Sequence, residues 1–181
     1  MNDQINFLKM IATRLDSAGI PYMLTGSVAM SLYAEPRMTR DIDLVIECND
    51  NSVSKIVSLF KDDCYISHEA VHDAVFQHGM FNIIHLESIM KADFIVKKDS
   101  DFRHVEFDRK NKIEIDGREF SVVTAEDLFL SKLMWWKESD SPMQQSDLNL
   151  LKSHGDLLNW SYILKWAERL HLKPWLEKLE Q

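Results

Sequence analysis

The sequence predicts an α/β fold in which a small mixed β-sheet is flanked by helices and followed by a C-terminal helical region. Two patterns carry this prediction. Up to about residue 123, short apolar runs of strand length alternate with stretches whose apolar residues recur at helical spacing. From Thr124 the apolar spacing is helical to the end of the chain.

These patterns divide the chain into an α/β core, residues 1–123, and a helical region, residues 124–181. A chain of 181 residues with 45% hydrophobic content can form one domain with such an extension. No Gly/Ser-rich linker marks the boundary. We therefore expect the C-terminal helices to pack on the sheet.

The first part of the core alternates helices and strands, and Gly19 followed by Pro21 ends the first helix. The expected elements are a helix at 3–18, a strand at 22–24, a short helix from 27, a strand at 42–46, a helix that Asn51 or Ser52 caps and that runs to 60, a short strand at 64–66 and a helix at 68–78.

The later elements end with a run of helices. Strands at 81–86 and 92–96 are separated by a short turn, so we expect an antiparallel pair. The charged stretch at 101–112 is interpreted as a solvated face. A hairpin at 112–123 turns at Asp116-Gly117, a capping box begins at Thr124, and further helices are expected at 143–153, 159–170 and 174–180.

Two polar motifs lie between the first two apolar runs, Gly26-Ser27 and Asp41-Ile42-Asp43. In a strand, Asp41 and Asp43 point to the same face. Two adjacent carboxylates repel each other, and when buried they need a cation or a proton, with Mg²⁺ suited to oxygen ligands. Gly26 lets the backbone approach a bound group, and a helix from Ser27 directs free N–H groups towards a phosphate.

Gly-Ser, thirteen residues, and then Asp-x-Asp at a strand start resembles the pattern of the polymerase-β-type nucleotidyltransferase superfamily. The chain looks most similar to small stand-alone bacterial members, including the nucleotidyltransferase toxins of the AbiEii type. The resemblance implies an enzyme with two Mg²⁺ ions that transfers a nucleoside monophosphate from an NTP, such as ATP, to an acceptor hydroxyl. The acceptor stays open between a tRNA, a protein and a small molecule, and a toxin would have an antitoxin partner.

The resemblance also implies metal ligands. Asp41 and Asp43 would hold the ions, and Asp93 matches the third carboxylate because it lies inside the apolar run 92–96. If that run pairs with residues 42–46, the three carboxylates converge on one face. The alternative is an exposed position for Asp93 on an edge strand, with Asp147 as the next candidate ligand.

Further residues match the nucleotide-binding part of these enzymes. Gly26 and Ser27 would hold the β- and γ-phosphates, with Arg40 or Lys132 as charge partners. Lys132 and Asp147 match a Lys and an Asp that the toxin-type enzymes carry on successive helices. In that role Lys132 neutralises developing charge and Asp147 holds it or orients the nucleophile. The alternative is an ordinary surface ion pair between two helices.

Other classes of function remain open. The segment His68-Glu-Ala-Val-His72 satisfies H-E-x-x-H, the motif of helix-borne zinc peptidases, and implies a zinc hydrolase. His78 stands at the place of a third ligand, but Val75 replaces the glycine that would swing it back. A second alternative is a non-catalytic nucleotide-binding or regulatory module of the same fold. In an alternative without any binding or catalytic role for these motifs, Gly26-Ser27 is a turn and the two aspartates lie on a solvated strand edge.

The composition limits the partners. The net charge of −8, from 29 acidic and 21 basic residues, argues against a large non-specific nucleic-acid surface. Two cysteines without metal-site spacing favour a reducing cytoplasmic setting. The N-terminus has no signal-type apolar run, and no apolar run is long enough to cross a membrane.

Overall fold

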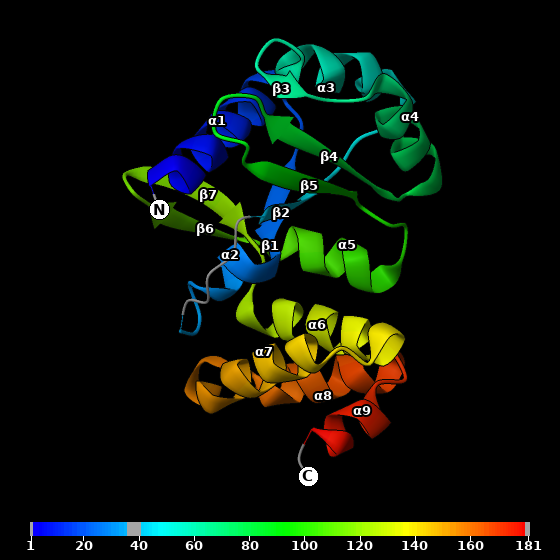
Figure 1. Ribbon diagram of the computed structural model, residues 1–181. Coiled ribbons are helices and arrows are strands. Elements are labelled where there is room, and N and C mark those ends of the chain that lie inside the picture. The colour runs from blue at the N-terminus through cyan, green and yellow to red at the C-terminus, as the bar shows by residue number, and fades with distance from the viewer. Residues whose placement is uncertain (1, 36–40, 180–181) are drawn as a thin grey trace.

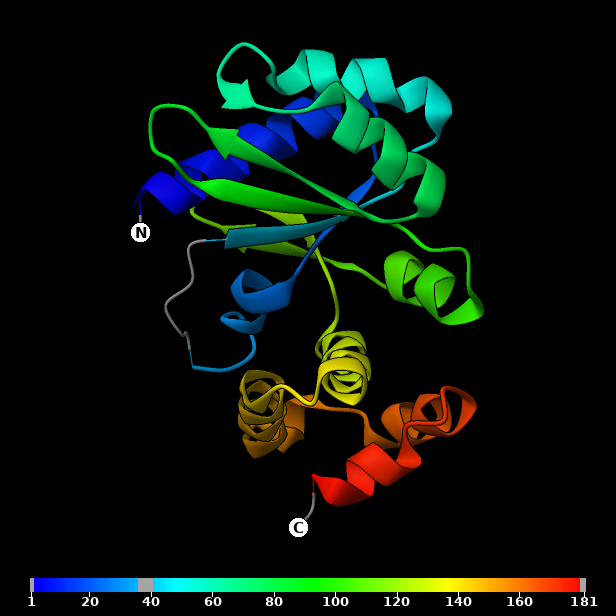
Figure 2. The same ribbon diagram turned by 45° about the vertical axis from the view of Figure 1, so that its right-hand side comes forward.

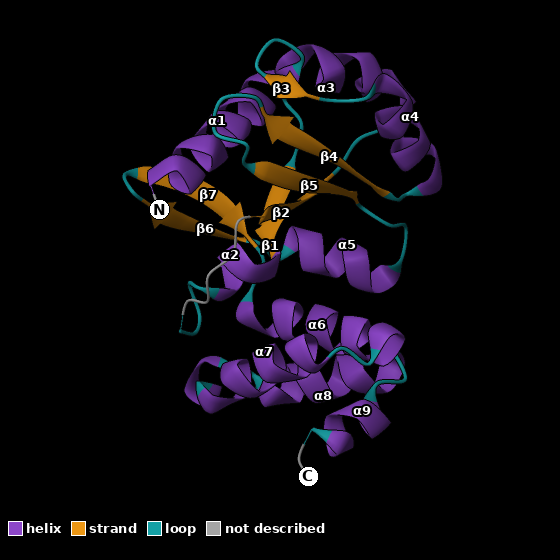
Figure 3. Cartoon of the chain, in the orientation of Figure 1, coloured by secondary structure: helices purple, strands orange, loops and turns teal. Residues whose placement is uncertain are grey.

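A mixed seven-stranded sheet forms the centre of the molecule (Figures 1 and 3). The computed structural model describes residues 2–35 and 41–179. The strand order is β3-β4-β5-β2-β1-β7-β6. The strands are β1 (Tyr22–Thr25), β2 (Asp41–Ile46), β3 (Cys64–Tyr65), β4 (Met80–His85), β5 (Lys91–Val96), β6 (Asn111–Ile115) and β7 (Arg118–Val122).

The helices lie on both sides of this sheet. Figures 1 and 2 show α1, α3 and α4 over one face, while α2 and α5 lie on the other face and α6 to α9 form a further layer beyond them. The α-helices are α1 (Asn2–Ala18), α2 (Gly26–Met30), α3 (Val53–Phe60), α4 (His68–Gln77), α5 (Asp101–Asp108), α6 (Ala125–Ser139), α7 (Pro142–Ser153), α8 (Trp160–Arg169) and α9 (Lys173–Lys178). The predicted α/β fold class is confirmed.

The central strands β2 and β5 are parallel neighbours and have one wholly apolar face. Leu44 pairs with Phe94 across the two strands, and both side chains are fully buried. Phe94 stacks on Phe81 of β4 and also contacts Phe60 of α3, with ring centroids 5.0 and 5.7 Å away. The helices over this face therefore form the core, and strand alternation leaves the opposite face to Asp41, Asp43 and Asp93.

Most predicted elements are confirmed within a residue or two. The strands at 81–86 and 92–96 do pair antiparallel, as β4 and β5. The hairpin at 112–123 is formed by β6 and β7 around Asp116 and Gly117. Ser52, one of the two predicted caps, is the N-cap residue of α3, but its side chain makes no cap hydrogen bond to this helix. Asn49 caps a short 3-10 turn, η1 (Asp50–Ser52), directly before it.

The charged stretch at 101–112 is the main correction. It was expected to be a solvated face, but its first part forms α5 and its end begins β6. Phe102 and Phe107 are buried, and the carboxylate of Glu106 is also buried. Charge balance along the sequence does not reveal this, because Arg103 compensates Glu106 from one helical turn away at 2.7 Å.

A buried carboxylate joins α6 to its neighbours. Asp127 is fully buried and accepts hydrogen bonds from the Thr124 hydroxyl (2.7 Å), Arg109 (3.0 Å) and the Tyr162 hydroxyl (2.6 Å). Thr124 caps the helix by accepting from the backbone N–H of Asp127. One half of the predicted capping box forms, the bond from the Asp127 N–H to Thr124. The Asp127 carboxylate instead binds side chains, including Tyr162 of α8 and Arg109 directly after α5.

Two further expectations concern the cysteines and membrane-spanning segments. Cys48 and Cys64 are both free thiols. Among the helices in the part of the chain that the structure describes, none combines the length and the apolar character that a membrane crossing requires.

We predict that Asp127→Ala lowers the free energy of unfolding by about 3–5 kcal/mol, because it leaves Arg109 without its buried partner and removes two hydroxyl contacts. Denaturant unfolding measures this. Glu168→Ala is the control, since Glu168 forms an exposed pair with Lys173 and its removal should change stability little. Equal effects in the two variants would show that Asp127 does not join these helices.

Candidate active site

Two aspartates lie side by side on the central strands. Asp43 of β2 and Asp93 of β5 are register partners in the parallel pair. On the other side of Asp43 its register partner is Thr25, the last residue of β1. Asp93 is 8% exposed and Asp43 is half-buried. The predicted neighbourhood of the strands is confirmed, and the edge-strand alternative for Asp93 is wrong because β5 lies between β2 and β4.

The position of the Asp43 side chain leaves no room for a side chain at residue 26, which is a glycine. Its φ is +64°, in the left-handed region that favours glycine. A Cβ at this position would lie 2.6 Å from Cγ and 2.8 Å from Cβ of Asp43, well inside van der Waals contact. The backbone N–H of Ser27 also donates to Asp43. The sequence predicts that Gly26 lets a ligand approach the backbone, whereas the group that approaches it here is the Asp43 side chain.

The electrostatics around Asp43 favour a cation. Burial, then the charge of Asp93, and also the charge of Asp41 raise the pKa of Asp43. The hydrogen bond from Ser27 and the charge of Lys132 lower it. One oxygen of Asp93, Oδ1, is buried and has no hydrogen-bond partner among the described residues. A buried carboxylate oxygen without a partner is costly, so this position suits a bound cation.

Lys91 supplies one cation at this site. Its Nζ lies 3.0 Å from Oδ2 of Asp93 and 3.8 Å from Oδ2 of Asp41, which is its register partner on β2. The hydrogen bond to Asp93, with the charges of the surrounding carboxylates, raises the pKa of Lys91 although burial opposes this. The sequence analysis missed Lys91. The available signal was its position two residues before Asp93, which places both side chains on one face of β5.

The three predicted metal ligands share a face of the sheet but do not form a finished cage. Among residues 2–35 and 41–179, no three His, Cys, Asp or Glu side chains lie close enough together to hold a metal ion. The carboxylate of Asp41 is 52% exposed and faces Lys91. The acidic pair and the unpartnered oxygen of Asp93 nevertheless fit a hard divalent cation, because such ions bind carboxylate oxygens together with water and substrate oxygens.

Lys132 and Asp147 form a buried ion pair between α6 and α7. Their charged atoms are 2.6 Å apart, and their side chains are 1% and 3% exposed. Gln144 lies 3.4 Å from the same Nζ. The alternative of an ordinary surface pair is therefore wrong. The charge of Lys132 also acts on Asp43, so the predicted Lys and the predicted aspartate belong to one electrostatic region.

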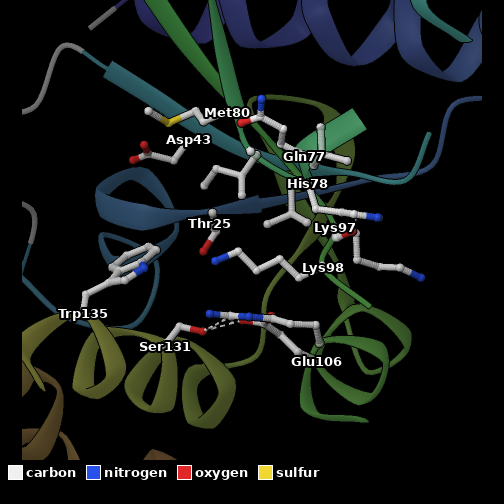
Figure 4. Close-up of a pocket in the computed structure, with 15 residues that line it drawn as sticks. Thr25, Asp43, Gln77, His78, Met80, Lys97, Lys98, Glu106, Ser131 and Trp135 are labelled. Atoms are coloured by element: carbon white, nitrogen blue, oxygen red, sulfur yellow. Dashed lines mark hydrogen bonds and ion pairs between the residues drawn. The ribbon is translucent and has the colours of Figure 1, made fainter. Parts of the chain in front are cut away.

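A pocket of about 520 Å³ opens beside Asp43, between the sheet and the helices α5 and α6. Figure 4 shows Asp43 on one side of it, Thr25 in the middle and Ser131 with Glu106 below. Arg103 donates to Ser131 at 2.6 Å, and Ser131 donates to Glu106 at 2.6 Å. Sequence reasoning missed this buried group, because its members lie on two helices and one of them, α5, belongs to the stretch interpreted as solvated.

The remaining predicted residues are Arg40 and three histidines, of which His78 lines the pocket (Figure 4). Arg40 lies outside the described residues. His68 and His72 are on α4, on the other face of the sheet, and His72 contacts Asp73. His78 ends α4 in a left-handed conformation, and its ring contacts the carbonyl of Lys97 at 2.8 Å.

Comparisons with known proteins address the fold. No family model and no curated protein matches the sequence. Several solved structures do match. A nucleotidyltransferase-like antigenic protein from Paracoccidioides brasiliensis is 20% identical with a TM-score of 0.55, and the match covers 84% of this chain and 75% of that one.

An antibiotic-resistance factor and an antibiotic adenylyltransferase are also similar. The match to ANT(2")-Ia in complex with adenylyl-2"-tobramycin is 14% identical, has a TM-score of 0.55, and covers 97% of this chain and 98% of the other. The lincomycin-bound lincosamide adenylyltransferase LnuA is 12% identical with a TM-score of 0.54, covering 85% and 98%. The fold is nucleotidyltransferase-like. At these identities the likeness concerns the fold alone, and it does not point to the AbiEii type.

We predict that Gly26→Ala destabilises this nucleotidyltransferase-like fold more than Gly117→Ala does. Both glycines have positive φ, so each substitution costs roughly 1 kcal/mol of backbone strain. Only at position 26 does the new methyl group meet another side chain, since nothing lies within 4 Å of position 117. Denaturant unfolding should show an extra loss of about 1–3 kcal/mol for Gly26→Ala. Equal losses would contradict the packing of Asp43 on Gly26.

We predict that Asp43→Asn raises the melting temperature at pH 7 in the absence of divalent cations. The pKa of Asp43 is raised in the folded protein above the ordinary value of 3.8. The folded state therefore binds this proton more tightly than the unfolded chain, and stability falls as pH rises through the folded pKa. Asparagine keeps the shape without the charge.

Melting curves between pH 7 and pH 4 measure this effect. The advantage of Asp43→Asn should shrink as the pH falls towards the ordinary aspartate pKa, where the wild-type carboxyl is protonated as well. Asp73→Asn on α4, with an exposed side chain, is the matched control. A variant that is less stable than wild type at pH 7 would show that Asp43 carries no raised pKa.

Proposed function

We propose that the protein is a Mg²⁺-dependent nucleotidyltransferase that moves a nucleoside monophosphate from an NTP to an acceptor hydroxyl. The observation that carries the proposal is the in-register pair of Asp43 and Asp93 beside Gly26-Ser27, with one buried oxygen of Asp93 that has no hydrogen-bond partner among the described residues. The nucleotidyltransferase-like fold supports it. Surface aspartates on a solvated strand edge would not be buried in this way.

Asp41, Asp43 and Asp93 are the residues that would hold Mg²⁺, with two ions as the resemblance implies. The metal would supply charge for the triphosphate and for the oxygen that leaves. Asp93 would accept the proton of the acceptor hydroxyl or orient it, because it lies beside Asp43 in strand register. The backbone at Gly26 and Ser27 would position the β- and γ-phosphates, with Arg40 as a further charge partner.

Lys132 would neutralise negative charge that develops on the phosphates. Its charge reaches Asp43, and Asp147 fixes the position of its ammonium group at 2.6 Å. A cation held in place before the substrate arrives needs no reorganisation during the reaction. Asp147 is therefore proposed to act through Lys132 and not as a metal ligand.

A small molecule is the first acceptor class to test. The pocket beside Asp43 has a volume within the range of small-molecule sites. Two of the similar structures hold a small molecule, lincomycin in one and adenylyl-2"-tobramycin in the other. The net charge of −8 counts against an extensive nucleic-acid surface. A tRNA or protein acceptor, a toxin role and an antitoxin partner remain implications of the sequence resemblance.

The labelled NTPs are incubated one at a time with Mg²⁺, wild-type protein and total cell extract. We predict that the label is transferred to one acceptor fraction. RNA, protein and small molecules are separated afterwards. Asp43→Asn should abolish labelling, because one ligand charge is lost while the fold is kept. Asp73→Asn should label like wild type. Labelling by Asp43→Asn at the wild-type rate would exclude the proposed site.

Two further variants separate the alternatives. Asp93→Ala should bind NTP but lose the chemical step by orders of magnitude in single-turnover labelling, since the acceptor loses its activating group. Replacing His68 and His72 by Gln should leave labelling intact, whereas a zinc hydrolase would lose its activity. NTP binding by wild type without any turnover would instead support the non-catalytic nucleotide-binding module.

A further inference from the structure

Lys91 is placed at the carboxylate cluster by strand register. It is the first residue of β5, opposite Asp41 on β2, and it shares a strand face with Asp93. Its ammonium lies between these two carboxylates, 3.0 Å from one and 3.8 Å from the other. This face of the sheet therefore carries three carboxylates and one cation that touches two of them.

The negative charges of the carboxylates destabilise the folded protein unless a cation such as Lys91 compensates them. Asp93 is almost fully buried, and Asp43 beside it carries the same charge. Like charges on neighbouring strands inside a protein raise the free energy of the folded state unless a counter-charge compensates them. In the protein without metal, Lys91 supplies part of that counter-charge.

We propose that Lys91 is the resident counter-ion of the carboxylate cluster, and that it leaves Asp41 and Asp93 when a divalent cation binds. This inference rests on the proposed metal site. Lys91 thereby lowers the affinity for the metal and stabilises the protein while the metal is absent.

The charges imply that Lys91 competes with a divalent cation for this site and does not help the cation to bind. Lys91 contacts Oδ2 of Asp41 and of Asp93, and the oxygen that suits a divalent cation, Oδ1, belongs to the same Asp93 carboxylate. A monovalent cation that stays there repels the incoming ion. Asp93 does not need Lys91 for its position, because its backbone is fixed between β2 and β4. The Lys91 side chain is 36% exposed, so its flexible stem can carry the ammonium into solvent.

Titration with Mn²⁺, followed by electron paramagnetic resonance of the free ion, tests the proposal on the full chain without nucleotide. Lys91→Met should bind Mn²⁺ about tenfold more tightly than wild type, since the competing charge is gone. Lys91→Arg should bind like wild type or more weakly, because its guanidinium keeps the charge. Lys61→Met, at the exposed end of α3, is the control for net charge and should leave affinity unchanged.

Thermal melting gives a second readout. Without metal, Lys91→Met should melt at a lower temperature than wild type, and saturating Mn²⁺ should raise its melting temperature more than that of wild type. Lys91→Gln is measured in parallel in case the methionine variant does not fold. Affinity in the folded neutral variants equal to or weaker than wild type would overturn the proposal.

The proposed metal site can fail separately. If wild type binds no Mn²⁺, or if Asp43→Asn binds it as well as wild type does, the metal site itself is wrong and the role of Lys91 falls with it. If Asp43→Asn loses binding while Lys91→Met leaves affinity unchanged, the metal site stands and only the role of Lys91 is overturned.

Discussion

The structure depends on the need to hold two like charges next to each other at the centre of a sheet. Strand register fixes Asp43 beside Asp93, and the apolar residues that alternate with them are locked into the core on the opposite face. A shift of β2 by one residue would turn Asp43 into the core beside Phe94 and turn Leu44 out of it, so the register is strongly specified. Three groups reduce the cost of this arrangement: the Ser27 N–H, the ammonium of Lys91 and the charge of Lys132.

The helical layer is joined to the core through buried polar groups as well as apolar contacts. Asp127 joins the end of α5 to α6 and α8, and Glu106 joins α5 to Ser131 of α6. The pKa of Glu106 is raised by its burial, although Arg103 and Ser131 counter this. Buried ionic groups are weak evidence for stability, but they accept few alternative partners. They therefore define one orientation of the helices that form the wall of the pocket.

The sequence predicted the parts of the site that follow from local pattern. Gly26-Ser27 and Asp41-x-Asp43 are recognised by spacing, and Asp93 stands out because a carboxylate interrupts an apolar strand. Lys91 could not be assigned, because its role depends on which residue lies opposite it on another strand. Burial at Glu106 and at the Lys132–Asp147 pair was equally hidden. Charged residues are mostly exposed, and only the packing of several helices shows which of them are not.

The close packing of Gly26 against Asp43 couples two positions that are seventeen residues apart in the chain. A side chain at position 26 and an aspartate at position 43 cannot share this space, so the two residues are constrained to change together. In an evolving lineage, loss of the acid would remove the steric need for glycine and leave only the backbone preference of the positive φ, and loss of the glycine would displace the acid. The identity of residue 26 therefore serves as a marker, readable from sequence alone, for homologous chains that have kept the acidic centre and for those that have abandoned it.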